Sequence, residues 1–500
     1  MSRRRHRTGP CFTPALLVLA LAGCAAPAWR QPDVMVPAAF KEGDSAVRTA
    51  ADGTTWTPAR PAEAQPRSEW WRAFGDPALD ALVERAGCAS PTLDVALARL
   101  RQARAQAGVA EADRSPQLGV EAGAQRARAA PAERGLPADT PSAPGTAYRA
   151  RLSASYEVDL FGRVSSNVAA ARLDARGAAA GYRAVLLALQ ADVAQAYLRL
   201  RALDAEQAAL DAAVALRAEN VQVNERRFAL GDIGEFDLSR ARTELATARA
   251  EAIALGRQRA VSEHALATLL GEAPAQFAQA VRPLARGEAA PVIPSGVPSA
   301  LLQRRPDVAL AQAAMEAANA RIGVARSAMF PALVIGANGG GVAETVHDIG
   351  SWSAHSWALG ALLSMPVVDG GRNRANVARS QAALDEAVGA YRQRVLAAFA
   401  EVEDSLAGVR VLAAQAAEVD RALLSAQRSA DLARKLYDAG RSSYLDLLDA
   451  ERALTAVQRQ DAVLRGERAL AAVALVRALG GGWDAPEAPE VRGAARVAAR

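Results

Sequence analysis

The fold is decided by a stretch that occurs twice in the chain. Residues 162–187 read GRVSSNVAAARLDARGAAAGYRAVLL, and residues 371–396 read GRNRANVARSQAALDEAVGAYRQRVL. The same offset of 209 positions relates the whole of 162–271 to 371–480 without a gap. A register kept over so long a span indicates an internal duplication, which must be recognised before any other structural prediction is made.

Each copy contains a long run with helical periodicity. Apolar residues recur at alternating steps of three and four, the heptad pattern of helices that pack side by side. In the first copy these positions are Leu186, Leu189, Val193, Ala196, Leu200, Leu203, Leu210 and Val214. The one polar residue on this seam is Gln207. No proline interrupts residues 167–228, so an unbroken helix of about 90 Å is predicted at 1.5 Å per residue.

Glycine turns are predicted to end both long helices, in FALGDIG at 228–234 and YDAGRSS at 437–443. Glycine suits the left-handed residue just past a helix end, and Ser442 or Ser443 can cap the helix that follows. Second helices are expected from about Phe236 and about Leu445. Each copy is therefore predicted to be a long antiparallel helical hairpin.

The first 23 residues are predicted to be a targeting segment rather than part of the fold. They combine four early arginines with an apolar run, 12–22, that is too short to span a membrane. The run ends in LAGC at 21–24, which resembles the bacterial lipobox, and this resemblance implies a lipid on Cys24. A plain signal peptide with an incidental cysteine is the alternative. Ala25, in place of an aspartate, points to the outer membrane.

Composition excludes several functional classes. Removal of the four arginines lowers the formal net charge from +5 to about +1, so nucleic-acid binding loses its main support. Cys88 would be the one cysteine without a lipid in the mature chain, which leaves no disulfide framework. The four histidines are scattered, and we find no phosphate loop, metal-ligand spacing or nucleophile motif. The sequence therefore predicts no catalytic residue, no metal and no cofactor, and the protein is not expected to be an enzyme.

Period-two alternation, typical of strands, follows Pro116 and returns after a polar loop. Apolar residues alternate with polar ones over 117–125 and 147–159. The second copy repeats this more weakly around 333–337 and 357–363. Strands of about ten residues with one apolar face suit a transmembrane barrel, although a soluble sandwich alternates in the same way.

The number of strands implies an oligomer. Four strands per chain cannot close a barrel, and an open edge in lipid leaves backbone groups unpaired at several kcal/mol each. The smallest barrels have about eight strands, so at least two chains must share one. Three chains would supply twelve strands, but this argument does not select three.

The stretch VIPSGVPSALLQRRPD at 292–307 resembles the signature of the TolC family. Its nearest branch is the lipoprotein outer-membrane factors of tripartite resistance-nodulation-division efflux pumps. Residues 317–325, Phe330-Pro331 and the closing LGGGW at 479–483 fit the same branch. The resemblance covers roughly 70–483.

This resemblance implies a mainly α protein with a small β part: a trimeric TolC-like α/β-barrel. A shared twelve-stranded outer-membrane barrel would continue into a helical tunnel across the periplasm. The implied partners are two other copies of the chain, outer-membrane lipid, a periplasmic adaptor protein and a proton-driven inner-membrane transporter. The tips that meet the adaptor would be Gly231, Asp232 and Ile233 in the first copy and Gly440 and Ser442 in the second.

Asp446 and Asp449 lie three positions apart, just after the second glycine turn, so both can project from one helix face. Composition alone favours solvated carboxylates near a helix start, where the helix dipole stabilises them. In the TolC family the matching Asp-x-x-Asp lines the constricted periplasmic end. The resemblance therefore implies a ring of carboxylates at that aperture, with Arg441 and Tyr444 as candidates for contacts that hold it shut.

The expected organisation follows the duplication, and the resemblance implies its equatorial parts. It comprises a signal peptide at 1–23, a tether and equatorial segment at 24–75, a first repeat at 76–272, an equatorial linker at 273–299, a second repeat at 300–480 and a tail at 481–500. Within the repeats, β-hairpins are expected at about 116–160 and 331–366, and helical hairpins at about 165–271 and 372–479.

The predicted function is a passive outer-membrane exit duct for drugs or other small molecules. One alternative is the outer-membrane channel of a type I secretion system, which uses the same fold. A second is a structural lipoprotein that spans the periplasm as a coiled coil, although such a spacer has no use for the period-two stretches.

Overall fold

A computed structural model describes residues 69–286 except 136, and 304–481, together with 32, 33, 36, 37, 40–42, 48, 49, 55, 56 and 293. The targeting segment, Cys24, most of the signature stretch and the tail after 481 lie outside the described residues.

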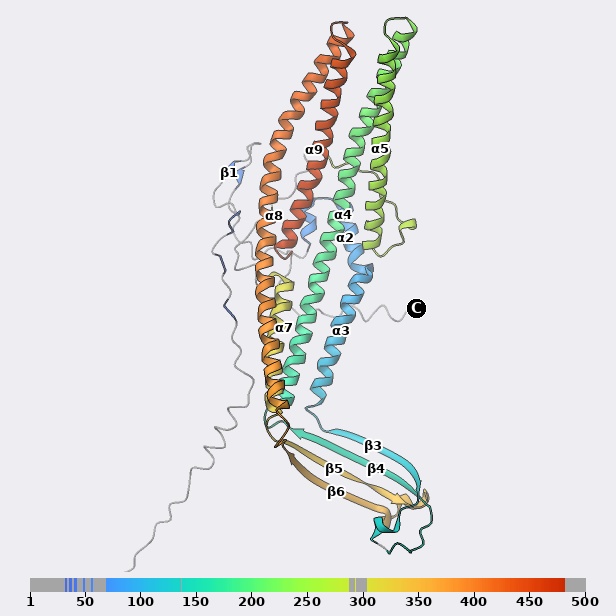
Figure 1. The fold of residues 1–500 in the computed structure, drawn as a ribbon, viewed down its shortest axis with the longest axis vertical. Helices are drawn as coiled ribbons and strands as arrows, with labels where there is room; N and C mark the ends of the chain where they lie inside the picture. The colour runs from blue at the N-terminus through green and yellow to red at the C-terminus, as the bar shows by residue number, and fades with distance from the viewer. Residues whose placement is uncertain are drawn as a thin grey trace, which may run out of the picture. The chain divides into compact units, whose positions relative to one another are not determined.

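Long helices dominate the described chain (Figure 1). The helices are α2 (Pro77–Ala89), α3 (Pro91–Ala112), α4 (Arg163–Ala229), α5 (Glu235–Leu269), α7 (Pro306–Ser327), α8 (Arg372–Asp438) and α9 (Tyr444–Ala478). The strands are β1 (Arg48–Thr49), β2 (Thr55–Trp56), β3 (Gln117–Ala127), β4 (Gly145–Val158), β5 (Ala332–Ala343) and β6 (His355–Ser364). Five short 3-10 turns, η1–η5, are also described, beginning with η1 (Trp70–Phe74).

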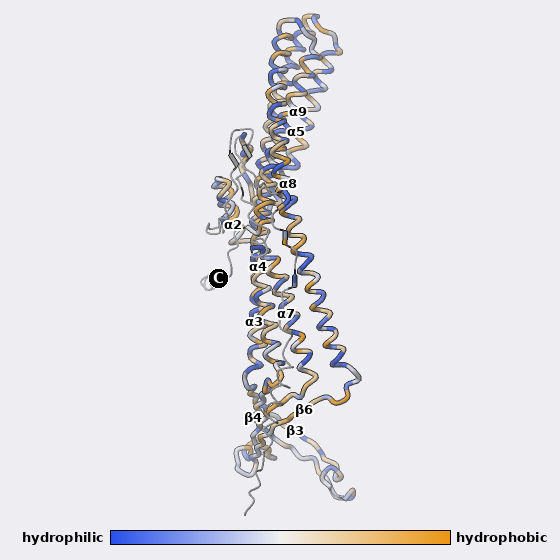
Figure 2. Tube along the Cα trace, turned by 90° about the vertical axis from the view of Figure 1, so that its left-hand side faces the viewer, coloured by the Kyte–Doolittle hydropathy of each residue, from blue (hydrophilic) through white to orange (hydrophobic). Residues whose placement is uncertain are grey.

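The duplication is confirmed in the bounds of the helices. The offset of 209 carries both ends of α4 onto those of α8, and both ends of α5 onto those of α9. The long helices have 67 residues each and the returning helices 35 each. Figure 2 shows polar and apolar residues interleaved along them, as the heptad pattern predicts. None of the helices described here combines the length and hydropathy of a membrane span.

The chain divides into two compact units, each of which draws on both copies of the repeat. Among the described residues, one contains 32–33, 99–179 and 310–392, and the other contains those of 34–98 and 180–309 together with 393–481. The units therefore cut across the repeats, and the boundaries drawn from the duplication remain a prediction.

The first unit holds a four-stranded antiparallel sheet in the order β3-β4-β5-β6 (Figure 1). Its register places the apolar positions of all four strands on one face: Leu118 pairs with Ala154, Ala154 with Ala337, and Ala337 with Leu359. Much of this face is open in the single chain, with Leu118 73% and Val120 82% exposed. The period-two stretches are therefore strands, and they leave an apolar surface that one chain does not cover.

Glycines in β5 allow a close approach of the β5–β6 loop. A Cβ atom at Gly341 would lie 2.4 Å from the carbonyl oxygen of Ile349, and one at Gly340 would lie 2.1 Å from that of Ala150. Only residues without a side chain fit at these two positions.

The core of the second unit forms where α2 packs on the predicted heptad seam. Leu189 and Val193 of α4 are buried with Leu79 and Leu82 of α2. Gln207, the polar residue of the seam, is half-buried and donates a hydrogen bond to Asp211 on its own helix (2.9 Å).

A buried polar cluster that sequence reasoning did not predict completes this core. Asp76 caps α2 and accepts hydrogen bonds from the Tyr197 hydroxyl (2.8 Å), from Arg201 (2.9 Å) and from Arg282 (2.7 Å). Burial alone would raise the pKa of Asp76, but the hydrogen bonds from Tyr197 and Arg282 outweigh it and hold the pKa below its usual value.

Candidate functional site

Both helical hairpins turn through the same backbone motif. Gly231 follows α4 and Gly440 follows α8, with φ angles of 80° and 66° that other residues rarely adopt. Each glycine amide donates to the carbonyl three residues back, and the next amide donates to the carbonyl five residues back. This is a Schellman motif. The predicted glycine turns are therefore helix stops, and they present short tips.

The helices that leave the two tips are capped differently. Ser443, the residue before α9, forms a capping box, in which its hydroxyl accepts from the Asp446 amide (3.2 Å) while the Asp446 carboxylate accepts from the Ser443 amide (3.0 Å). The equivalent residue before α5 is Gly234, which has no side chain to offer. Of the two predicted caps, Ser443 is the one used. Hydrogen bonds from Ser443 hold the pKa of Asp446 below its usual value.

The two candidate aperture carboxylates have different surroundings. Asp446 is exposed and turned back on its own helix start by the capping box. Asp449 is also exposed and lies 3.6 Å from the guanidinium of Arg452. Arg452 in turn binds both carboxylate oxygens of Glu244 on α5. The structure therefore places both aspartates on solvent-facing surface one helical turn apart.

Tyr444 lies between the two hairpins of one chain. Its ring is half-buried against Val221 of α4 and Ala241 and Leu245 of α5. Burial, followed by the nearby Glu451 and Glu244 carboxylates, raises the pKa of Tyr444 to about 12. Tyr444 therefore joins the hairpins as a neutral, packed ring.

Arg441 behaves differently from Tyr444. Its side chain is exposed and, within the described residues, makes no hydrogen bond or ion pair; its amide closes the Schellman turn. No side-chain contact within the single chain supports the predicted role of Arg441 in closing the periplasmic end.

Tip residues of the first copy are more apolar than those of the second. Leu230 is 78% exposed and Phe236 is 74% exposed, while Asp232 is exposed and Ile233 half-buried between them. The Ser442 hydroxyl, at the second tip, is buried without a hydrogen-bond partner among the described residues.

A buried polar cluster lies just behind the tips, and sequence reasoning missed it. Glu451 of α9 accepts from the Asn220 side chain of α4 (2.8 Å) and from Arg434 of α8 (3.1 Å). Burial raises the pKa of Glu451, and the neighbouring Arg434 only partly offsets this. One turn further on, the Tyr437 hydroxyl donates to Asn224 (3.4 Å). Three helices are therefore joined by groups that would be costly to leave unpaired.

Part of this cluster carried a sequence signal. Continued in steps of three and four, the heptad seam of α4 reaches Asn224, and a polar residue at such a position fixes the alignment of packed helices.

A ladder of ion pairs joins α5 to α9. Glu244 and Glu251 are seven residues apart, as are their partners Arg452 and Arg459, and Arg459 lies 3.1 Å from Glu251. A search for heptad-spaced opposite charges would have found this ladder.

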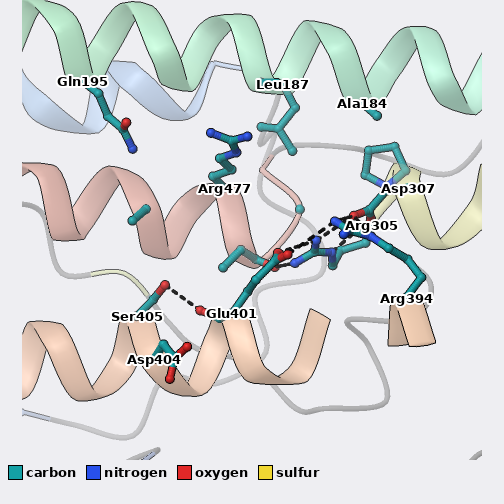
Figure 3. A pocket seen from close by; sticks show the side chains of 15 residues that line it. Ala184, Leu187, Gln195, Arg305, Asp307, Arg394, Glu401, Asp404, Ser405 and Arg477 are labelled. Carbon is teal, nitrogen blue, oxygen red and sulfur yellow. Dashed lines mark hydrogen bonds and ion pairs between the residues drawn. The ribbon is translucent and has the colours of Figure 1, made fainter. Parts of the chain in front are cut away.

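The end of the signature stretch forms a buried ion cluster (Figure 3). Arg305 is 4% exposed and donates to Asp307 (3.0 and 2.6 Å), to Glu401 of α8 (2.6 Å) and to the carbonyl of Ala478 (2.9 Å). Arg394 of α8 binds the same Asp307 carboxylate. Burial alone would raise the pKa of Asp307, but these guanidinium groups hold it below its usual value.

The ion cluster lines a cavity of about 590 Å³. Other polar groups on its wall include Gln195, Asp404 and Arg477, and Arg477 pairs with Asp192 (3.1 Å). The two arginines and the two acids of this cluster neutralise one another. Their contacts join Asp307 of α7, Arg394 and Glu401 of α8 and the Ala478 carbonyl of α9. In the described part of the chain, no group of three or more His, Cys, Asp or Glu side chains is placed to hold a metal ion.

The outer membrane efflux protein family matches residues 82–272 and 297–481, one segment in each copy of the repeat. The chain belongs to this family. Its predicted fold class is confirmed by a solved structure of the outer-membrane channel OprN, which superposes with a TM-score of 0.81 at 29% identity and covers 92% of this chain and 99% of that one.

Relatives of this efflux protein extend over nearly the whole chain. The pyoverdine export outer membrane protein OpmQ of Pseudomonas putida is 36% identical over 430 residues, covering 85% of this chain and 90% of the relative. The probable outer membrane lipoprotein SilC of Salmonella typhimurium is 29% identical over 469 residues, covering 93% and 97%. The predicted efflux function and outer-membrane location are therefore confirmed, and the family is one of channels rather than enzymes.

Proposed function

We propose that three copies of this efflux protein form the exit duct of a tripartite pump, in which a proton-driven inner-membrane transporter and a periplasmic adaptor deliver the cargo. The observation that carries this proposal is the sheet of the first unit. Its apolar face is shared by all four strands and is open in the single chain, and β3 and β6 each pair on one side alone within the sheet. In lipid, both unpaired edges require strands from other copies.

The proposed duct is passive and closes at the hairpin ends. Asp446 and Asp449 from three copies would form a ring of carboxylates at the narrowest point, attracting cations and repelling anions. Tyr444 and the Arg452–Glu244 pair support closure, because they join the second hairpin to the first within one chain. Opening would move the second hairpin away from these contacts when the adaptor docks.

Docking is assigned to the two tips, at Gly231, Asp232 and Ile233 and at Gly440 and Ser442. A photo-reactive residue placed at Asp232 or at Arg441 tests this in living cells, since both side chains are exposed and neither position needs a positive φ. Both variants should capture a periplasmic adaptor of a proton-driven pump. The same residue at exposed Glu133, in the loop between β3 and β4, is the matched control and should not.

Capture of a different partner would change the proposed function. An adaptor of an ATP-driven exporter at either tip would move the protein to type I secretion. If a correctly located trimer captures no adaptor from either tip, docking at these turns is contradicted and the structural lipoprotein becomes the better account.

A lipid on Cys24 is proposed to anchor the mature chain. The lipobox resemblance supports this, and the relative SilC carries the name lipoprotein. Cys24→Ser should abolish incorporation of labelled palmitate, whereas Cys88→Ser, at the exposed cysteine of α2, should leave incorporation unchanged. Labelling that survives Cys24→Ser would exclude this anchor.

A further inference from the structure

The polar face of the sheet carries few charges, and they are unevenly placed. Along β3 and β4, the charged side chains on this face are Glu121, Arg149, Arg151 and Glu157. Glu157, at the end near α4, is neutralised by Arg163, which donates to both of its carboxylate oxygens at 2.6 Å. The net charge of this face therefore depends on Glu121, Arg149 and Arg151.

The register of β3 and β4 gives the two arginines different neighbours. Arg151 lies directly opposite Glu121 on the neighbouring strand, close enough for the two charges to compensate each other. Arg149 lies opposite Gly123, and its guanidinium donates to the neutral Gln125 side chain (2.7 Å). The positive charge at Arg149 is therefore oriented by a hydrogen bond but has no acidic residue directly opposite it, since Glu121 lies opposite Arg151.

The neighbouring strands β5 and β6 carry shorter side chains than the arginines on this face. On the same face, Gly340 of β5 lies opposite Arg151. Further along, Gly336 pairs with Gly360, and Asn338 pairs with Ala358. Val342 of β5 lies opposite Arg149, and Val334 pairs with Leu362 on the same face. The arginines are therefore longer than any side chain that β5 and β6 place on this face.

We infer that Arg149, supported by Arg151, gives the barrel lumen a ring of guanidinium groups that selects anionic solutes at the exit. This rests on the proposed function, because the polar face becomes the lumen only when three copies close a barrel with their apolar faces in lipid. Each copy then contributes one uncompensated positive charge at the level of Arg149.

The chemistry of arginine defines the solutes that this ring favours. A guanidinium group is always charged and presents a planar fork of donors that matches carboxylate and phosphate groups. Charge held in a confined lumen raises the local concentration of the opposite ion. The ring therefore favours solutes that carry carboxylate or phosphate groups, opposite in sign to those favoured by the proposed carboxylate aperture.

The test is the reversal potential of purified trimers in planar bilayers under a KCl gradient. The background is Asp446→Asn with Asp449→Asn, so that the aperture carboxylates do not mask the barrel. This background should prefer chloride to potassium. Adding Arg149→Gln and Arg151→Gln should shift the reversal potential toward zero or to the cation side.

Arg126→Gln is the matched control. Arg126 lies on β3 but at a position of the opposite, apolar face, so its loss should leave the reversal potential unchanged. If channels form but the arginine variants do not move the reversal potential, or if Arg126→Gln moves it as far, the anion ring is overturned while the duct stands. If the background forms no channel at all, the duct and the ring fall together.

Discussion

Replacing Arg305 with methionine is expected to cost the folded protein about 3 kcal/mol, toward the low end of the penalty for breaking a buried ion pair. Methionine retains the apolar stem of the side chain but offers no hydrogen-bond donor. The loss of stability therefore arises because Asp307, Glu401 and the Ala478 carbonyl would no longer receive hydrogen bonds from the buried guanidinium. Partial exposure of both carboxylates keeps the cost from being larger.

Arg477→Met is the matched control on the wall of the same cavity. Its side chain is 49% exposed and pairs with Asp192, whose side chain is 44% exposed, so its loss should cost about 0–1 kcal/mol. Arg305→Lys should fall between the two, since a lysine retains the charge without the fork of donors. The midpoint of heat-induced loss of helical circular dichroism in detergent measures all three. Equal midpoints for Arg305→Met and Arg477→Met would show that the cluster contributes no special stability.

The second large effect is expected at the aperture. Asp446→Asn with Asp449→Asn should raise single-channel conductance and weaken the preference for cations in planar bilayers, because the ring of charge at the narrowest point would be lost. Asparagine suits this test better than alanine, since its side-chain oxygen can still accept the hydrogen bonds of the capping box.

The duplication supplies a control for this effect. Asp237 is the counterpart of Asp446 at the start of α5, so Asp237→Asn removes a carboxylate at the same helical position of the other hairpin. It should change the current far less than the double variant does. Currents indistinguishable from those of the unaltered protein would remove Asp446 and Asp449 from the aperture.

Asp446 also shows why a local sequence pattern does not decide the role of a residue. The spacing of Asp446 and Asp449 is equally compatible with a helix start and with an aperture, and the structure shows that Asp446 belongs to a capping box. Both roles can coexist, since a carboxylate that accepts hydrogen bonds from Ser443 keeps its charge and its exposure. The conductance of the trimer tests the aperture role.

The elements of the fold were predictable because their signals are local. Heptad spacing, the glycines at 231 and 440 and the period of two after Pro116 each act within a few residues, and the observed helices and strands begin and end close to the predicted positions. The duplication strengthened every one of these predictions, since each signal could be read twice.

The contacts between helices were not predictable in the same way. Asn220 and Glu451 are 231 residues apart in the chain, and Arg305 and Ala478 are 173 apart. Their pairing depends on which faces of long helices meet, and a rotation of one helix would separate them without changing its local pattern. The sequence alone was enough for the hairpins, the strands and the need for partner chains, whereas the ion cluster at Arg305, the polar cluster behind the tips and the uncompensated Arg149 arise from packing and strand register.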